Sequence, residues 1–301
     1  MHEIELTGLD GGNLLAYLAA LGTLRVLSLD AGNGEVRMSW ADRGRWTAVL
    51  NHPEAAGQDQ MLDRLEKLVC GEDSIRKAWQ IGNDLTLPSI EFGRLMREST
   101  LAAEEDRPHA DFLAAFGCDV YPIGPKKDLM ADTAFRTMSG AGHQHFLGFM
   151  RELAAATDRE HLRRTLFAEW DYADGRPSLR WDPADYRPHA LRALDPSTDP
   201  IRTMRGANRL AVEGLPLFPA MPQRRRVRTV AFEEDDVGTA VAWPIWTEAL
   251  DASTVAALIA SGEGQRLAAG LPPRPGVAQV YRARRFTEGK YRNFSPARAL
   301  L

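Results

Sequence analysis

A nearly all-apolar stretch close to the start of the chain constrains the fold more than any other feature. Within residues 14–29 only Thr23, Arg25 and Ser28 are clearly polar, so almost every face of a helix here would be apolar or small. Such a helix has to be buried. The run covers about sixteen residues, against roughly twenty for a membrane span, and Arg25 interrupts it. We therefore expect a central core helix, capped by Asp10, and no membrane segment.

Strand patterns precede and follow this helix. Residues 2–6 are strand-like, and residues 35–40 and 45–50 alternate around a turn, which predicts a hairpin that extends the sheet of the first strand. Further along, the periodicity predicts helices at 61–69, 74–81, 89–105, 110–116, 144–156, 159–170, 204–213, 253–261 and 263–269, a strand pair at 226–232 and 240–246, and a last strand at 277–286. The fold class is α+β: a mixed sheet with a buried N-terminal helix and a smaller mixed α/β C-terminal lobe.

The composition changes between residues 172 and 200, where Asp, Pro and Arg dominate. We place a boundary there, because such stretches usually connect domains rather than form them. The predicted organisation is an N-terminal α+β lobe at 1–170, a Pro/Asp/Arg-rich connection at 171–200 and a C-terminal lobe at 201–301 with a basic end.

Composition and charge limit the function classes. The chain is 44% apolar and 26% charged, as in globular proteins, and its two cysteines stand far apart, which argues for a reducing and hence cytoplasmic compartment. The net charge of -4 argues against a protein that coats nucleic acid with its whole surface. The last segment nevertheless carries seven cations against one acid from residue 274 to 301. The arginines of residues 224–228 are answered at once by the acids of residues 233–236.

The central segment 126–145 combines cations, hydroxyl groups and a Gly-Ala-Gly turn that would open a helix. The stretch before it, 119–128, is rich in proline and glycine and is predicted to be a loop. Backbone N–H groups at a helix start, with cations nearby, are the elements of a phosphate site. No Gly-Lys-Ser/Thr ending makes the segment a P-loop, and a glycine-rich helix entry with solvated lysines explains the same residues.

Signs of a metal site or a catalytic group are weak. His143 and His145 are two positions apart and would point in different directions, without a Cys-x-x-Cys or His-Glu-x-x-His motif. Cys118 and Ser139 are the nucleophile candidates in interesting loops, and neither lies in an elbow motif. We therefore expect no metal, no cofactor and no catalytic residue.

Aromatic residues alternate with arginines near the C-terminus, at Tyr281, Phe286, Tyr291 and Phe294. This pattern suits a nucleic-acid backbone with bases or sugars against the rings, and it equally suits an arginine-rich edge strand with core aromatics. For the tryptophans of segment 243–246 we expect core packing.

Several of these stretches together resemble the Cascade large-subunit-like proteins of type I-U (also called I-G) CRISPR systems. The resemblance rests on the start of the chain with Ala19-Ala20-Leu21-Gly22-x-Leu24, on Phe135-Arg136-Thr137-x-Ser139-Gly140-x-Gly142-x-Gln144 before a helix, on Leu215-Pro216-Leu217-Phe218-Pro219, on Trp243-Pro244-Ile245-Trp246 and on the basic end. In order and spacing these motifs cover most of the chain.

This resemblance implies a non-catalytic subunit of a crRNA-guided antiviral surveillance complex. Such a subunit would contact target double-stranded DNA and other effector subunits and recruit a separate helicase-nuclease, while guide pairing reads the sequence. The residues expected to contact DNA are Lys126, Lys127, Arg136, Thr137, Ser139 and Gln144. The residues expected to touch nucleic acid or a neighbouring subunit are Arg282, Arg284, Arg285, Lys290 and Arg292.

Two other functions remain open from the residues. The first is a metal-dependent nuclease or nucleotide-using enzyme with segment 126–145 as its active site. The second is a protein-interaction subunit without nucleic-acid contact, whose C-terminal arginines pair with an acidic partner.

Overall fold

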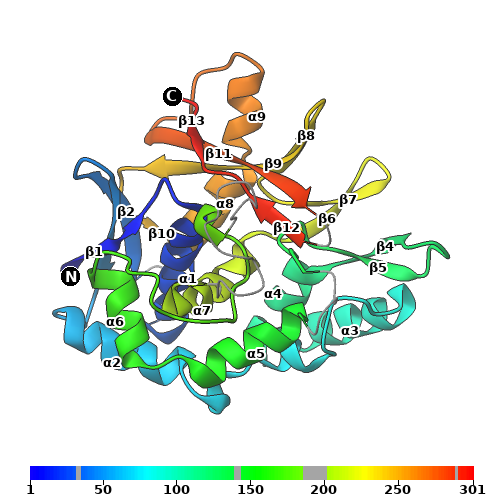
Figure 1. The fold of residues 1–301 in the computed structure, drawn as a ribbon, viewed down its shortest axis with the longest axis horizontal. Helices are drawn as coiled ribbons and strands as arrows, with labels where there is room; N and C mark the ends of the chain where they lie inside the picture. The colour runs from blue at the N-terminus through cyan, green and yellow to red at the C-terminus, as the bar shows by residue number, and fades with distance from the viewer. Residues whose placement is uncertain (32–34, 139–143, 186–201, 289–290) are drawn as a thin grey trace, which may run out of the picture.

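A four-stranded antiparallel sheet and the helix that follows its first strand form one half of the fold (Figure 1). The computed structural model describes residues 1–31, 35–138, 144–185, 202–288 and 291–301. The sheet has the order β1-β3-β2-β10, with β1 (His2–Asp10), β2 (Arg37–Asp42), β3 (Trp46–His52) and β10 (Leu250–Asp251). The expected first strand and the hairpin that extends its sheet are confirmed.

Helix α1 (Leu14–Ala31) is the expected core helix, and its residues 14–28 are all buried. Its cap differs from the expectation, because Asn13 Oδ1 accepts a hydrogen bond from the Ala16 N–H at 3.1 Å. Asp10 instead accepts from the Gly12 N–H within the preceding turn, at 2.8 Å. With 18 residues, α1 is long and apolar enough to cross a membrane, but 83% of it is buried inside the protein, as in the core helix of a soluble protein.

A second helix, α7 (Arg205–Gly214), packs on α1 at very close range. A Cβ atom at Gly22 would lie 1.8 Å from the Leu210 carbonyl oxygen, so only glycine permits this backbone contact. On its other side α7 meets α6 (Arg159–Phe167), where Gly206 has the same role against the His161 carbonyl oxygen. The small residues of these helices therefore set how closely the helices pack.

The second main sheet has the order β12-β11-β9-β8, and β13 (Arg298–Ala299) also pairs with β11. Its other strands are β8 (Phe232–Asp235), β9 (Gly238–Trp246), β11 (Val277–Glu288) and β12 (Tyr291–Phe294). The predicted pairing of residues 226–232 with 240–246 is wrong in part. The backbone turns at Ala231, with φ 69°, so β7 (Arg226–Thr229) pairs instead with β6 (Ala220–Gln223) in a separate hairpin.

Two tryptophans of β9 join the sheets. Trp243 Nε1 donates to the Gly11 carbonyl and Trp246 Nε1 donates to the Met38 carbonyl, each at 2.8 Å. Both rings are buried and pack around Tyr17 of α1. The expected core packing of this segment is confirmed, and the apolar core is continuous from the N-terminal strands to the C-terminal ones. The predicted domain boundaries themselves stay a prediction.

The remaining helices surround these sheets. They are α2 (Gln58–Val69), α3 (Ser89–Leu101), α4 (Arg107–Phe116), α5 (Phe146–Ala156), α8 (Ala252–Ala260) and α9 (Glu263–Ala268). The helix expected at 74–81 is wrong: two short 3-10 turns, Glu72–Ser74 and Lys77–Gln80, stand there. Arg76 between them is extended, with its guanidinium directed to the buried Glu213.

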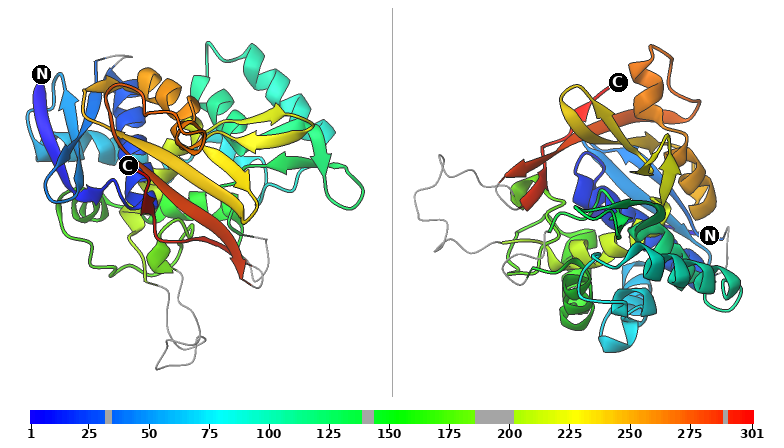
Figure 2. Two further views of the ribbon diagram at one scale, coloured as in Figure 1. Left: turned by 90° about the horizontal axis from the view of Figure 1, so that it is seen from above. Right: turned by 90° about the vertical axis from the view of Figure 1, so that its right-hand side faces the viewer.

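The predicted loop 119–128 is a strand in its first half. β4 (Gly117–Ile123) and β5 (Leu129–Asp132) form a hairpin, and the turn occupies only the stretch between them. Pro122 fits because the pairing of the two strands is irregular between Cys118 and Ile123. Figure 2 shows that the β4–β5 and β6–β7 hairpins project from the same side of the molecule.

Candidate nucleic-acid interface

Arg136, the central cation of the predicted segment, is held between two carboxylates. Its Nη2 lies 2.8 Å from Asp84 Oδ2 and its Nη1 lies 2.9 Å from Asp132 Oδ2. Burial lowers the pKa of Arg136, but the two carboxylates outweigh burial and raise it above its usual value. The side chain is therefore charged and locked in place, and in this arrangement its guanidinium faces protein carboxylates.

The neighbours of Arg136 are also inside the protein. Thr137 is buried, and its hydroxyl donates to the Leu179 carbonyl at 2.8 Å. Gln144 is buried just before α5. Ser139 lies outside the described residues. The segment is thus built into the core on both sides of the stretch 139–143.

The C-terminal strands bring two further arginines to the same place. Arg285 of β11 donates from Nη2 to the Arg136 carbonyl at 3.0 Å, and Arg292 of β12 donates from Nη1 to the same oxygen at 3.2 Å. The backbone N–H of Arg292 donates to the Thr137 carbonyl at 3.1 Å. Two segments that the sequence places about 150 residues apart therefore form one site.

The place where Arg285 and Arg292 meet Arg136, called the junction below, carries an excess of positive charge. Three guanidiniums, those of Arg136, Arg285 and Arg292, meet only the carboxylates of Asp84 and Asp132 in the described part of the chain. Burial and then the charge of Arg292 lower the pKa of Arg285 to about 10. Its Nε is buried without a hydrogen-bond partner among the described residues. An anion at this point would relieve the repulsion between these cations.

Two other predicted cations are neutralised in part. Arg284 contacts both carboxylate oxygens of Asp235, at 2.9 and 2.7 Å, and Arg282 contacts the same carboxylate at 2.7 Å. The hydrogen bonds from Arg284 and then Arg282 hold the pKa of Asp235 far below its usual range. These two arginines share one acid on the exposed side of the β8–β9–β11 sheet.

Lys126 and Lys127 stand away from the junction, at the exposed tip of the β4–β5 hairpin. Lys290 lies outside the described residues. The structure also places two arginines that the sequence analysis discounted, Arg224 and Arg225, at the exposed tip of the neighbouring β6–β7 hairpin. The sequence did not distinguish them: of this arginine run, Arg226 pairs with Glu234, and neither Arg224 nor Arg225 forms an ion pair with the acids that follow, in the described residues.

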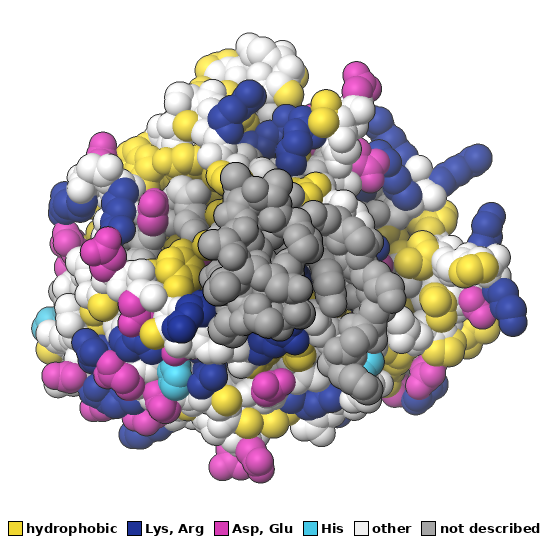
Figure 3. All heavy atoms as spheres, in the orientation of Figure 1, with side chains coloured by type: hydrophobic (Ala, Val, Ile, Leu, Met, Phe, Trp, Pro, Cys, Tyr) yellow, Lys and Arg dark blue, Asp and Glu magenta, His cyan; other side chains and the backbone are white. Residues whose placement is uncertain are grey.

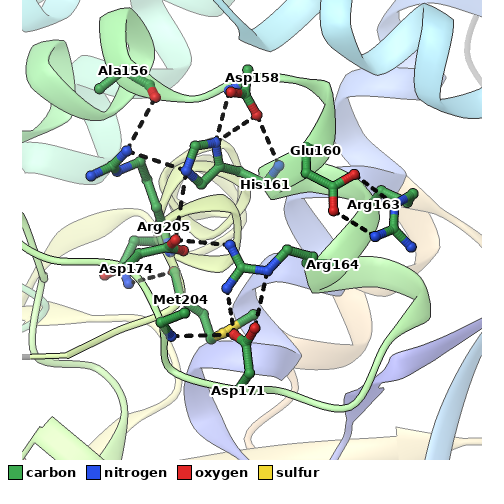
Figure 4. Close-up of polar contacts among 12 residues, drawn as sticks. Ala156, Asp158, Glu160, His161, Arg163, Arg164, Asp171, Asp174, Met204 and Arg205 are labelled. Atoms are coloured by element: carbon green, nitrogen blue, oxygen red, sulfur yellow. Dashed lines mark hydrogen bonds and ion pairs between the residues drawn. The ribbon is translucent and has the colours of Figure 1, made fainter.

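Another polar cluster lies between α6 and α7 (Figure 4). His161 Nδ1 is 2.6 Å from Asp158 Oδ1, and Arg205 Nη1 donates to His161 Nε2 at 3.2 Å. The Nε2 of this histidine also lies 3.6 Å from Asp174 Oδ1, so both ring nitrogens have partners. Asp174 accepts from Arg164 at 2.9 Å and from the Arg205 N–H at 2.8 Å. This arrangement joins helices α6 and α7 through side-chain contacts.

Three observations bear on the enzyme alternative: metal-ligand groups, the cysteines and Asp132. No three His, Cys, Asp or Glu side chains there are arranged to hold a metal ion. Cys118 is buried, and burial raises the pKa of Cys70 to about 11, which disfavours its thiolate. Asp132, in the segment where the enzyme alternative places the active site, is paired with Arg136.

Comparison with known proteins adds no assignment. No protein-family model matches the sequence, and the search of curated proteins finds no match.

Proposed function

We propose that the chain is a non-catalytic subunit of a crRNA-guided CRISPR antiviral surveillance complex of the cytoplasm. In this proposal it contacts target double-stranded DNA and neighbouring effector subunits, with crRNA in the same assembly and a helicase-nuclease recruited by it. The observation that carries the proposal is the convergence of Arg285 and Arg292 on the backbone of Arg136. The motifs behind the family resemblance include both sides of this junction.

Positive charge supports this proposal. A protein that binds DNA without reading its sequence does so mainly through cations on phosphates, and guide pairing supplies the sequence specificity in such complexes. Arg285 and Arg292 have no ion pair with a carboxylate in the described residues, so their charge is available to a phosphate. A modest cationic site on an acidic protein suits a subunit that contacts DNA at a few points within a larger assembly.

The test is the salt dependence of binding to a DNA duplex. Arg285→Gln with Arg292→Gln removes the two unpaired charges and keeps hydrogen-bonding side chains. We expect the slope of log affinity against log salt to fall by about 1.8, because each lost phosphate contact contributes about 0.9.

Arg282→Gln with Arg284→Gln is the matched control. It also removes two charges from β11, but these charges are already shared with Asp235, so we expect a smaller change of slope. Equal slopes for the wild type and the Arg285/Arg292 variant would remove the junction from the DNA interface.

A further inference from the structure

Two hairpins project side by side from the molecule, and each carries a pair of cations at its tip. They are β4–β5, with Lys126 and Lys127, and β6–β7, with Arg224 and Arg225; β4 packs beside both strands of the second hairpin. We propose that these two tips together grip the phosphodiester backbone of a nucleic acid. The inference rests on the proposed function for the choice of ligand, and it adds the β6–β7 tip with Arg224 and Arg225 to the contact expected of Lys126 and Lys127.

The charges of the tips are unpaired. All four side chains are exposed, and none forms an ion pair with a carboxylate in the residues that the structure describes. The next residue, Arg226, shows the contrast, since it pairs with Glu234. Figure 3 shows Lys and Arg side chains projecting along the right-hand edge, where Figure 1 places the two hairpins.

The backbone of the second tip is unusual for the residues it carries. Arg224 and Arg225 have φ of 49° and 66°, and they connect the paired residues Gln223 and Arg226. A two-residue hairpin turn with both residues at positive φ strongly favours Asn-Gly, and a side chain there costs free energy. Lys127, at φ 51°, is in the same region of backbone space. The sequence thus keeps cations where turn geometry favours other residues, which points to a use for their charge.

An extended polyanion explains the arrangement better than an acidic spot on a protein. The two tips lie on neighbouring hairpins, so their four cations form one extended group of charges. The pocket of about 150 Å³ at the base of the hairpins is mixed in charge, with Arg228 and Arg285 beside Asp132, Glu233 and Glu234, so the cationic surface is confined to the tips. A nucleic-acid backbone offers phosphates at regular spacing to such a group of charges. The exposed Met221 and Ile123 on the same hairpins offer apolar contacts for sugars or bases.

The experiment uses a variant that should not harm the fold. Arg224→Asn with Arg225→Gly removes both charges and installs the residue pair that the turn prefers, so we expect an equal or higher melting temperature. Lys126→Ala with Lys127→Gly removes both charges of the other tip, and glycine adopts the positive φ of position 127 without strain. Binding of the full chain to a labelled DNA duplex of about 30 base pairs is followed by fluorescence anisotropy at about 50 to 300 mM KCl. Each variant should lose about 1.8 units of log-log slope, and the two combined about 3.6.

Arg159→Asn with Arg163→Asn is the control for net charge. Both arginines are on α6, away from the hairpins in Figure 1, and both are paired with carboxylates. An unchanged slope in this control, with reduced slopes in the hairpin variants, is the expected result.

The outcomes separate this inference from the proposed function. Unchanged slopes in the hairpin variants, with a reduced slope in the Arg285/Arg292 variant, would overturn the hairpin contact and leave the proposed function standing. If the hairpin variants lose a co-purifying acidic protein but keep the wild-type slope, the tips bind protein, which also overturns it. No duplex binding by the wild type, alone or with its sister subunits, would overturn both.

Discussion

At the scale of single residues, Glu213 is a buried carboxylate whose charge needs cationic partners. Glu213 of α7 is fully buried and lies 2.9 Å from Arg209, 3.1 Å from Arg76 and 3.4 Å from Arg25. Burial raises the pKa of Glu213, but the three guanidiniums outweigh it and hold the pKa below its usual value. The carboxylate is therefore ionised and compensates charges from three segments.

Replacing this carboxylate should destabilise the protein strongly. In Glu213→Gln the guanidiniums lose their partner, and breaking a buried pair costs about 3–5 kcal/mol of unfolding free energy. Urea denaturation measures this loss of unfolding free energy. Glu160→Gln is the control, because Glu160 pairs with Arg163 at the surface and its loss should change stability little. A similar change for both variants would contradict the account of the buried cluster.

Glu213 should also make the free energy of unfolding depend on pH. Because the pKa of Glu213 is lower in the folded state than in the unfolded state, its stabilisation is full above the unfolded value of about 4.3 and declines as the pH falls toward the folded pKa. The stability difference between wild type and Glu213→Gln should be constant from about pH 6 to 8 and shrink below about pH 4.3. A difference that stays constant in urea titrations down to about pH 3 would show that no such shift exists.

The sequence pointed to individual cations but not to the residues that pair with them. Arg136 and Arg285 were both singled out from their local surroundings, and the structure brings them together. Asp84, 52 residues before Arg136, carries no local signal that it will pair with it. The shared pairing of Asp235 with Arg282 and Arg284 is equally invisible, because it depends on which strands become neighbours. Which charges remain free is therefore a property of the fold.

At the scale of elements, glycine contacts fix the packing of α1 on α7. Gly22→Ala would place a Cβ atom 1.8 Å from the Leu210 carbonyl oxygen, so the helices must move apart. We expect a loss of about 1–3 kcal/mol or more in the free energy of unfolding. Gly175→Ala is the control, since no atom lies within 4 Å of a Cβ there. Equal stability of the two variants in urea would mean that α1 and α7 do not meet at this contact.

Local periodicity predicted most elements, and it failed where chain geometry overrides it. The buried helix α1 and the hairpin β2–β3 follow directly from their apolar patterns. The run from residue 226 to 232 looks like one strand, but the backbone turns at Ala231 and divides it between two sheets. Pro122 led to the prediction of a loop, but the irregular pairing of β4 with β5 accommodates this proline. Bulges and positive φ at non-glycine residues leave little trace in a sequence.

At the scale of the whole molecule, one apolar core connects the two main sheets. The tryptophans of β9 reach the N-terminal turn and strand, and α7 lies directly on α1. The β4–β5 and β6–β7 hairpins extend from this core, and exposed cations stand at their tips. The molecule thus combines one continuous core with projecting basic hairpins.

Purification of the tagged protein from its native host tests the proposed membership of a crRNA-guided complex. The complex would be sized, and the nucleic acid that accompanies it would be sequenced. We expect a large assembly that carries repeat-spacer RNA of uniform length. A monomer free of RNA, purified while its sister subunits are demonstrably expressed, would contradict the claim.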